Sequence, residues 1–260
     1  IIRCVGSPDE RFNEDGLRIL RALRFASVLD FELDADCADS VRRLKGLLGK
    51  ISRERIYTET TKLLLGKGAR RILSTFPEVI SFIFPALTEE MICRAAALVE
   101  RCPRDAEMRY AVLLSELDAK EEERMISSMK PSRAEKNAVL RYSKYENYRN
   151  YLDCEYEVRR LISATDDGFV LSLTDMQLSR GVITDEEYAA VREMISEIIE
   201  KNLPRKLSDL AVDGKTLMSI GYAGADIGHE LTRLLDDVMR GRCENTAREL
   251  TERARGDKAQ

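Results

Sequence analysis

An acid and three arginines recur at every third position near the start of the chain. They are Asp15, Arg18, Arg21 and Arg24, within a segment that runs from Gly6 to Asp34. Each step of three residues along an α-helix turns back by about 60°, so these side chains would spread over one broad face. Acid–arginine pairs at such spacings also stabilise ordinary helices, by a few tenths of a kcal/mol. The pattern therefore fits either a stabilised helix or a face that lines a groove.

A carboxylate beside a guanidinium has the hydrogen-bonding pattern needed to read two of the four nucleobases. Cytosine and adenine each present an amino donor next to a ring-nitrogen acceptor. A carboxylate accepts from the amino group, and a guanidinium donates to the ring nitrogen. Guanine and uracil present the reverse order. Asp15 and Arg18 could thus admit C and A and reject G and U, with further arginines near the phosphates.

Three helices are expected to position these residues. The first starts with Glu14 and Asp15, whose carboxylates suit the N-terminal dipole, and takes Asn13 as its cap. The second runs from about Asp34 to Leu48, and the third begins at Ser52. Short turns would join the three helices into one compact unit.

The rest of the chain also reads as helices, punctuated by proline and glycine. Capping boxes are expected where Ser132 precedes Glu135 and where Thr184 precedes Glu187. The last long helix carries an apolar stripe at helical spacing, formed by Ile227, Leu231, Leu234 and Val238. The predicted fold class is therefore all-α, with several helical domains.

The chain opens with the apolar run Ile1–Val5, which has the look of a strand. A strand at a terminus needs a partner, and the remaining sequence contains no other convincing strand. We therefore expect that a preceding domain has been separated from this chain.

The composition narrows the class of protein. Hydrophobic residues make up 44% and charged residues 34% of the chain, and the net charge of −4 argues against wholly electrostatic binding of nucleic acid. A local basic face remains compatible with that charge. Six cysteines without a CxxC pair, and a single histidine, make a zinc site unexpected and suggest a cytoplasmic protein. No run approaches the roughly 20 apolar residues of a membrane span, so no membrane partner is expected.

The stretch from Arg3 to Asp34 resembles the end of the head and the start of the neck in class II tRNA nucleotidyltransferases, the family of the CCA-adding enzymes. The motif that reads the nucleotide there is an acidic pair, two spacer residues and an arginine, which correspond to Glu14, Asp15 and Arg18. The family usually has proline where Gly16 stands, a departure that affects the start of the helix more than the side chains that read the base.

The resemblance implies roles for these residues. Asp15 and Arg18 would read the incoming base beside Glu14, and Arg21 and Arg24 would help to bind the nucleotide. The following segment ISRERIYTETTKLL is similar to the next neck motif of the family. Its charged residues would brace the neck, or they would form a solvated helix start: Arg53, Glu54 and Arg55.

The resemblance also implies three domains, with a neck at 1–65, a body at 66–150 and a tail at 151–260. The segment LAVDGKTLMSIGYAGADIG is similar to the tail of bacterial CCA-adding enzymes. Residues there that would approach a tRNA phosphate are Lys215, Gly221, Gly224 and Gly228. These glycines also suit tight turns, and the two interpretations have similar weight.

The catalytic head of the family carries a glycine-rich strand and a DxD pair that holds two Mg²⁺ ions. The sequence contains neither, and Asp34 with Asp36 and Asp166 with Asp167 read as helix starts and turns. His229, the single histidine, reads as a helix residue. The resemblance therefore implies that the whole enzyme uses Mg²⁺, and that this chain alone lacks catalytic and metal ligands and is inactive.

The expected function is base selection and tRNA binding within an enzyme that adds CCA to the tRNA 3′ end from CTP and ATP. Three alternatives stay open: a fragment of a bacterial poly(A) polymerase, a helical scaffold for protein partners, and a stand-alone RNA-binding module. The sequence does not separate full CCA addition from A-adding or CC-adding specificity.

Overall fold

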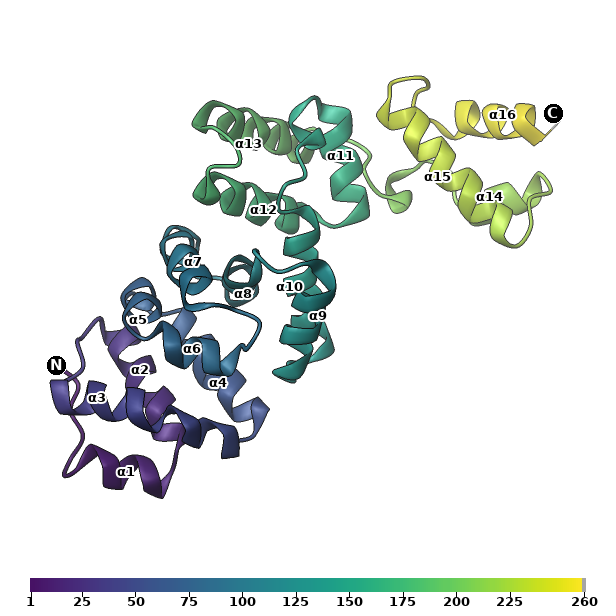
Figure 1. Ribbon diagram of the computed structural model, residues 1–260. Helices are drawn as coiled ribbons and strands as arrows, with labels where there is room; N and C mark the ends of the chain where they lie inside the picture. The colour runs from purple at the N-terminus through teal and green to yellow at the C-terminus, as the bar shows by residue number, and fades with distance from the viewer. Residues whose placement is uncertain (259–260) are drawn as a thin grey trace. The chain divides into compact units, whose positions relative to one another are not determined.

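The computed structural model describes residues 1–258, and within that range it consists of sixteen α-helices and three short 3-10 helices (Figure 1). The predicted all-α fold class is confirmed. The chain forms two compact units. The first comprises Ile1–Asn147 and Asp175–Val182, and the second comprises Tyr148–Thr174 and the described residues from Ile183 onward. The division into neck, body and tail stays a prediction.

The first unit contains the segment with the candidate site. Its helices follow one another through short turns, since the loops between them are a few residues long (Figure 1). The helices are α1 (Pro8–Glu14), α2 (Leu17–Leu29), α3 (Ala35–Leu44), η1 (Lys45–Lys50), α4 (Arg53–Leu64), α5 (Ala69–Thr75), α6 (Pro77–Ile83), α7 (Glu89–Arg101), α8 (Ala106–Leu114), α9 (Ala119–Ser128) and α10 (Arg133–Tyr145).

The second unit is built from the later helices, and α12 runs across the boundary between the two units. Leu217, Leu234 and Leu250 are fully buried in a small core of its own near the C-terminus. The helices are η2 (Asn150–Leu152), α11 (Glu155–Ala164), α12 (Asp167–Arg180), α13 (Asp185–Glu200), η3 (Leu207–Asp209), α14 (Gly214–Ser219), α15 (Ala225–Met239) and α16 (Ala247–Lys258).

The base of the site is the packing of α2 against α4. Ile19, Leu20 and Leu23 are fully buried on the inner face of α2. The two helices are joined where Ser27 Oγ donates a hydrogen bond to the carbonyl oxygen of Leu63, at 2.7 Å. A Cβ at residue 66 would lie 2.2 Å from Ser27 Oγ and 2.6 Å from the Ser27 carbonyl carbon, so only glycine fits there. This contact fixes α2 on α4.

Arg109 ties the end of α4 to α8. Its side chain is 4% exposed, and its guanidinium donates to the carbonyl oxygens of Leu64, Cys102 at 2.8 Å and Pro103 at 2.9 Å. Burial lowers the pKa of Arg109 from its usual value. Because its donors are satisfied by carbonyls that helix ends leave free, the buried charge serves the structure.

The predicted first helix is wrong at its start. Glu14 ends α1, Asp15 has extended backbone with φ −150°, and α2 begins only at Leu17. Asn13 is no cap, because it lies inside α1 and donates to the carbonyl oxygen of Asp9. Pro8 at the first position of α1 starts a helix earlier than expected.

The second predicted helix divides into two elements. The α-helical part ends at Leu44, and the 3-10 helix Lys45–Lys50 takes its place. Two glycines lie within this stretch, and glycine weakens a helix interior. The third predicted helix is confirmed, since α4 follows Ser52 directly.

The apolar opening of the chain has a partner inside the chain, contrary to expectation. Ile2 forms one isolated parallel bridge with Leu33, in which its amide donates to Glu32 O at 2.7 Å and its carbonyl accepts from Asp34 N at 2.8 Å. This bridge is the only β-structure in residues 1–258. Arg3 adds an ion pair to Asp34 at 3.0 Å.

Both predicted capping boxes are confirmed. Ser132 Oγ accepts from Glu135 N at 3.2 Å, and Glu135 Oε2 accepts from Ser132 N at 2.7 Å. Thr184 and Glu187 make the same pair of bonds at 3.2 Å and 2.8 Å. These local signals depend on neighbours within one turn, so sequence alone identifies them.

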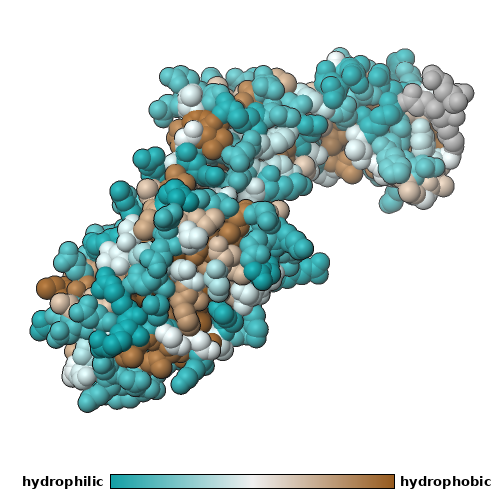
Figure 2. Space-filling model, viewed as in Figure 1, coloured by the Kyte–Doolittle hydropathy of each residue, from teal (hydrophilic) through white to brown (hydrophobic). Residues whose placement is uncertain are grey.

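The face of the molecule drawn in Figure 2 is mostly polar. Figure 2 shows hydrophilic side chains over much of the visible face, with hydrophobic residues in small groups. None of the helices in the described part of the chain combines the length and the apolar character required to cross a bilayer.

Candidate nucleotide-recognition site

Asp15 lies in the turn between α1 and α2, where both of its carboxylate oxygens have partners. Oδ1 accepts from the amide of Leu17 at 3.0 Å, and Oδ2 accepts from Arg55 Nη2 at 3.2 Å. The side chain keeps 33% of its surface exposed. The carboxylate is therefore held at the start of α2 without being buried in the core.

Arg18 lies in the first turn of α2 and is held from the side of α1. Its Nη1 donates to the carbonyl oxygen of Arg11 at 3.2 Å and forms an ion pair with Glu14. Glu14 also accepts from Arg11 Nη1 at 2.8 Å. The hydrogen bond from Arg18 is the main reason that the pKa of the Glu14 carboxyl lies below its usual value. With 42% of its side chain exposed, Arg18 reaches solvent.

The amide of Arg18 donates to the carbonyl oxygen of Asp15 at 3.0 Å, but the two side chains have different partners. Arg18 lines a hollow of about 330 Å³ with Cys4, Val5 and Arg11. Glu14, which the sequence grouped with the pair, acts here as the partner of Arg18. Both side chains of the pair thus keep part of their surface exposed to solvent.

Arg55 binds the Asp15 carboxylate, whereas the sequence predicted only that Arg55 would brace the neck. It reaches Asp15 from α4, and the two residues are 40 positions apart. Arg53, by contrast, donates to the carbonyl oxygen of Ile83 at 3.2 Å. No local pattern distinguishes these two arginines, because the α2–α4 packing decides which one faces the site.

Arg21 and Arg24 diverge along α2. Arg21 is exposed, whereas the Arg24 side chain is only 14% exposed and lies 3.2 Å from Glu59 Oε2. That contact is an ion pair without hydrogen-bond geometry, since Glu59 Oε2 has no hydrogen-bond partner. The Arg24 guanidinium also lies 4.0 Å from the centroid of the Phe25 ring. Arg24 lines a different hollow from the one beside Arg18.

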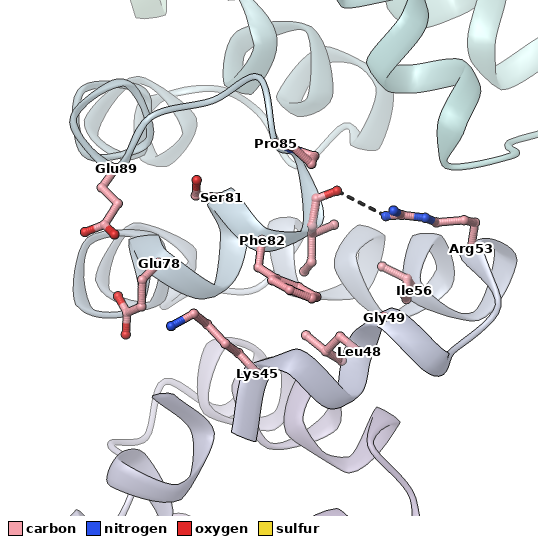
Figure 3. Close-up of a pocket in the computed structure, with 11 residues that line it drawn as sticks. Lys45, Leu48, Gly49, Arg53, Ile56, Glu78, Ser81, Phe82, Pro85 and Glu89 are labelled. Atoms are coloured by element: carbon pink, nitrogen blue, oxygen red, sulfur yellow. Dashed lines mark hydrogen bonds between the residues drawn. The ribbon is translucent and has the colours of Figure 1, made fainter. Parts of the chain in front are cut away.

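A hollow of about 570 Å³ lies between η1, α4 and α6 (Figure 3). Lys45 and Glu78 lie at one end and Arg53 at the other, with Phe82 between them. Glu89 adds a second carboxylate to its lining. Because acids offset the cations, this hollow has no clear preference for an anion.

The candidate RNA-binding residues of the C-terminal segment cluster around α14 and the start of α15. Lys215 is exposed in α14, which Asp213 caps by accepting from Thr216 N at 2.8 Å. Gly221 and Gly224 have φ of +98° and +56°, values that turns reserve largely for glycine. Gly228 lies in α15, and a Cβ added there would meet no atom within 4 Å. A turn role accounts for the first two glycines, and phosphate binding stays a prediction.

Three of the four acids in the remaining pairs have structural partners, and Asp36 is exposed in the first turn of α3. Asp166 Oδ1 accepts from Phe169 N at 2.7 Å at the start of α12, and Asp167 pairs with Arg205 at 2.8 Å. Asp34 precedes α3 and binds Arg3. Across residues 1–258, no three His, Cys, Asp or Glu side chains gather closely enough to hold a metal ion.

The sequence matches a model of an RNA-binding region. The family model described as the probable RNA and SrmB-binding site of polymerase A matches residues 30–91, which include α3, η1, α4 and α6. This region supplies Arg55 and the surface against which α2 packs. The part of the chain against which α2 packs is thus similar to an RNA-binding region.

Relatives that match over most of the chain include CCA-adding enzymes. The enzyme of Bacillus pumilus is 30% identical over 254 residues, which are 94% of this chain and 60% of that protein. The enzyme of Bacillus licheniformis is 29% identical over 97% of this chain and 63% of its own length. The chain therefore spans under two thirds of these curated relatives.

A solved structure has the same fold. The CCA-adding enzyme of Bacillus stearothermophilus, crystallised in complex with CTP, superposes with a TM-score of 0.81 at 23% identity over 99% of this chain and 65% of that chain. The poly(A) polymerase alternative is not favoured by these relatives.

Proposed function

We propose that this chain is the base-selecting and RNA-binding part of an enzyme that adds CCA to the 3′ end of tRNA from CTP and ATP. The proposal is supported most directly by one arrangement: Asp15 and Arg18 are anchored on one turn yet remain partly exposed. The relatives named above, one of them crystallised with CTP, support the choice of substrate.

The chemistry of selection follows from the two side chains. Asp15 accepts from the amino group of C or A, and Arg18 donates to the adjacent ring nitrogen. A guanine or uracil would bring an N–H against Arg18 and a carbonyl against Asp15, so both contacts would be repulsive. The Arg55 hydrogen bond orients the Asp15 carboxylate toward the base. Arg18 must share its donors between Glu14 and the base.

Nucleotidyl transfer itself is assigned to residues outside this chain. The tRNA 3′ hydroxyl attacks the α-phosphate and pyrophosphate leaves, in a reaction for which the family uses Mg²⁺. The described residues offer no set of ligands that fits such an ion. Because the family carries its catalytic carboxylates in the head domain, this chain alone is expected to be inactive. The whole enzyme is expected to act in the cytoplasm. Within it, 1–65 would select the base, 66–150 would form the body and 151–260 would bind tRNA.

The test is binding of the four nucleoside triphosphates to this chain, measured by nuclear magnetic resonance titration. CTP and ATP should bind more tightly than GTP and UTP. Asp15→Ala and Arg18→Ala should each remove that difference, whereas Asp39→Ala, which removes an exposed acid from α3, should leave it unchanged. Equal binding of all four triphosphates by the unaltered chain would reject base selection.

A stand-alone RNA-binding module is the second candidate, because the family model that matches is an RNA-binding region. It shares the expected binding of tRNA with the first proposal. It differs in one respect, since Asp15→Ala would then have no effect on any ligand.

A further inference from the structure

A basic hollow lies on the first unit, separate from the one beside Arg18. It has a volume of about 500 Å³ and lies between the last turns of α2 and α4 and the loop before α8. Its charged residues are Arg24, Lys62, Lys67 and Arg104, and Phe25 forms part of its apolar lining. No Asp or Glu lines it.

Of the four cations of this basic hollow, only Arg24 has an acidic partner within the described chain. Glu59 offsets Arg24. Lys62, Lys67 and Arg104 are exposed and have no ion-pair partner among the described residues. The hollow of Figure 3 differs in this respect, because its lining includes two glutamates. Three unpaired cations around one hollow favour an anion with several charges.

Phe25 gives the basic hollow an exposed aromatic surface. Its side chain is 40% exposed, although a phenylalanine in a monomeric protein is usually buried. The Arg24 guanidinium, 4.0 Å from the ring centroid, helps to hold the ring in place. Aromatic rings inside basic grooves are the platform on which single-stranded nucleic acids stack their bases. A protein ligand would need three carboxylates placed to meet the three cations of this hollow. An RNA strand carries a negative phosphate at every nucleotide.

Phe25 and Arg18 lie on the same face of α2. Seven residues separate them, which is nearly two helical turns, so their directions differ by only about 20° and their positions by about 10 Å along the axis. The basic hollow is therefore aligned with the residues proposed to read the base.

We propose that the basic hollow binds a strand of RNA, with a phosphate among Lys62, Lys67 and Arg104 and a base stacked on Phe25. The inference rests on the proposed function and adds where the RNA strand crosses the first unit. The strand would run along α2 toward Arg18, which places the end of the RNA beside the incoming nucleotide.

The probe is a fluorescently labelled tRNA transcript that ends before its CCA sequence, and its binding to this chain is measured by anisotropy at several salt concentrations. The double variant Lys62→Gln with Lys67→Gln should reduce the slope of log K against log salt by about 0.7 for each phosphate that the variant no longer neutralises. Phe25→Ala should weaken binding by about tenfold, within the range for loss of one stacked base, and leave the slope unchanged.

Two matched controls separate this site from general effects. Lys120→Gln removes an exposed cation from α9, and Phe82→Ala removes a ring that is 38% exposed in the hollow of Figure 3. Both should bind the tRNA as the unaltered chain does. Phe25→Tyr keeps a stacking surface and should restore binding. If Phe25→Ala unfolds the protein, Phe25→Tyr still shows whether an aromatic ring at this position supports binding.

The outcomes are distinct. If the unaltered chain fails to bind the tRNA, the proposed function loses its RNA-binding part and the basic hollow loses its ligand. If the chain binds but the Lys62, Lys67 and Phe25 variants match their controls, the hollow is not an RNA site, and the proposed function stands. In that case Lys62 and Lys67 only stabilise the C-terminal end of α4, where the helix dipole is negative, or another protein segment packs on Phe25.

Discussion

Arg55 Nη2 lies 3.2 Å from Asp15 Oδ2 and joins α4 to the turn that precedes α2. The bond orients a carboxylate whose second oxygen accepts from the amide of Leu17. A base-reading acid held on two sides loses little freedom when a nucleotide binds, which favours selectivity. Arg55 is therefore a positioning residue for the proposed site.

Removal of Arg55 should weaken the discrimination between nucleotides and have little effect on the stability of the fold. Arg55→Ala is expected to reduce the preference for CTP and ATP over GTP and UTP by about three- to tenfold, because a charge-assisted bond at a partly exposed site is removed. Comparison of the four dissociation constants measures this effect. Arg70→Ala is the control, since it removes a similar exposed ion pair, to Glu100 at 2.8 Å. Equal preference in both variants would show that Arg55 has no part in selection.

Gly66 should tolerate no side chain. The Cβ of Gly66→Ala would meet the backbone of Ser27 at 2.6 Å, and helix backbone cannot move aside without disturbing α2. Overpacking of this kind costs about 1–3 kcal/mol. Denaturant unfolding measures that change. Gly46→Ala, with no atom within 4 Å of the added Cβ, should unfold as the unaltered chain does. A comparable loss of stability in both variants would argue against the close approach as the cause.

Glu122 should make stability depend on pH. Burial raises the pKa of its carboxyl to about 7, against a hydrogen bond from Ser143 that lowers it. The folded state therefore keeps a proton that the unfolded state releases near pH 4.5, so stability falls as pH rises between those values. The loss amounts to about 3 kcal/mol. Glu122→Gln should unfold at the same denaturant concentration from pH 5 to pH 8, apart from changes that both proteins share.

Cys4 and Cys37 should form a disulfide under oxidising conditions. Their sulfur atoms lie 3.8 Å apart, and burial raises the pKa of the Cys37 thiol to about 12, so the less buried Cys4 should attack first. Oxidised glutathione would accept the two electrons in two exchange steps and leave as two reduced molecules. A non-reducing peptide map should reveal the linked pair.

The two exposed cysteines provide the control for that experiment. Cys93 and Cys154 are accessible to glutathione and should carry it as a mixed disulfide. Modification of these residues without a Cys4–Cys37 link would contradict the prediction. Because Cys4 lines the hollow beside Arg18, the link would also hold that wall of the hollow in place.

Local signals in the sequence predicted much of the fold. The capping boxes at Ser132 and Thr184 and the start of α4 each depend on residues within a single turn. The break between α1 and α2 was missed because it depends on tertiary packing as well as on Pro8. A Cβ at Gly16 would lie 2.9 Å from Leu47 Cβ, a contact that no local pattern contains.

The candidate site was predictable in its residue types but not in its contacts. Asp15 and Arg18 stood out through their spacing and their resemblance to a known motif. The residue that holds Asp15 could not be predicted. Arg55 lies 40 positions away, and nothing in the sequence distinguishes it from Arg53. Arg24 was grouped with Arg18 by periodicity, yet Glu59 and Phe25 draw it toward a different hollow.

The close contact between Gly66 and Ser27 leaves α2 and α4 no clearance to slide past each other. Asp15 precedes α2 and Arg55 belongs to α4, so the spacing of this ion pair depends on that contact. A side chain at residue 66 would therefore shift the proposed site as well as the core, although it lies outside the site.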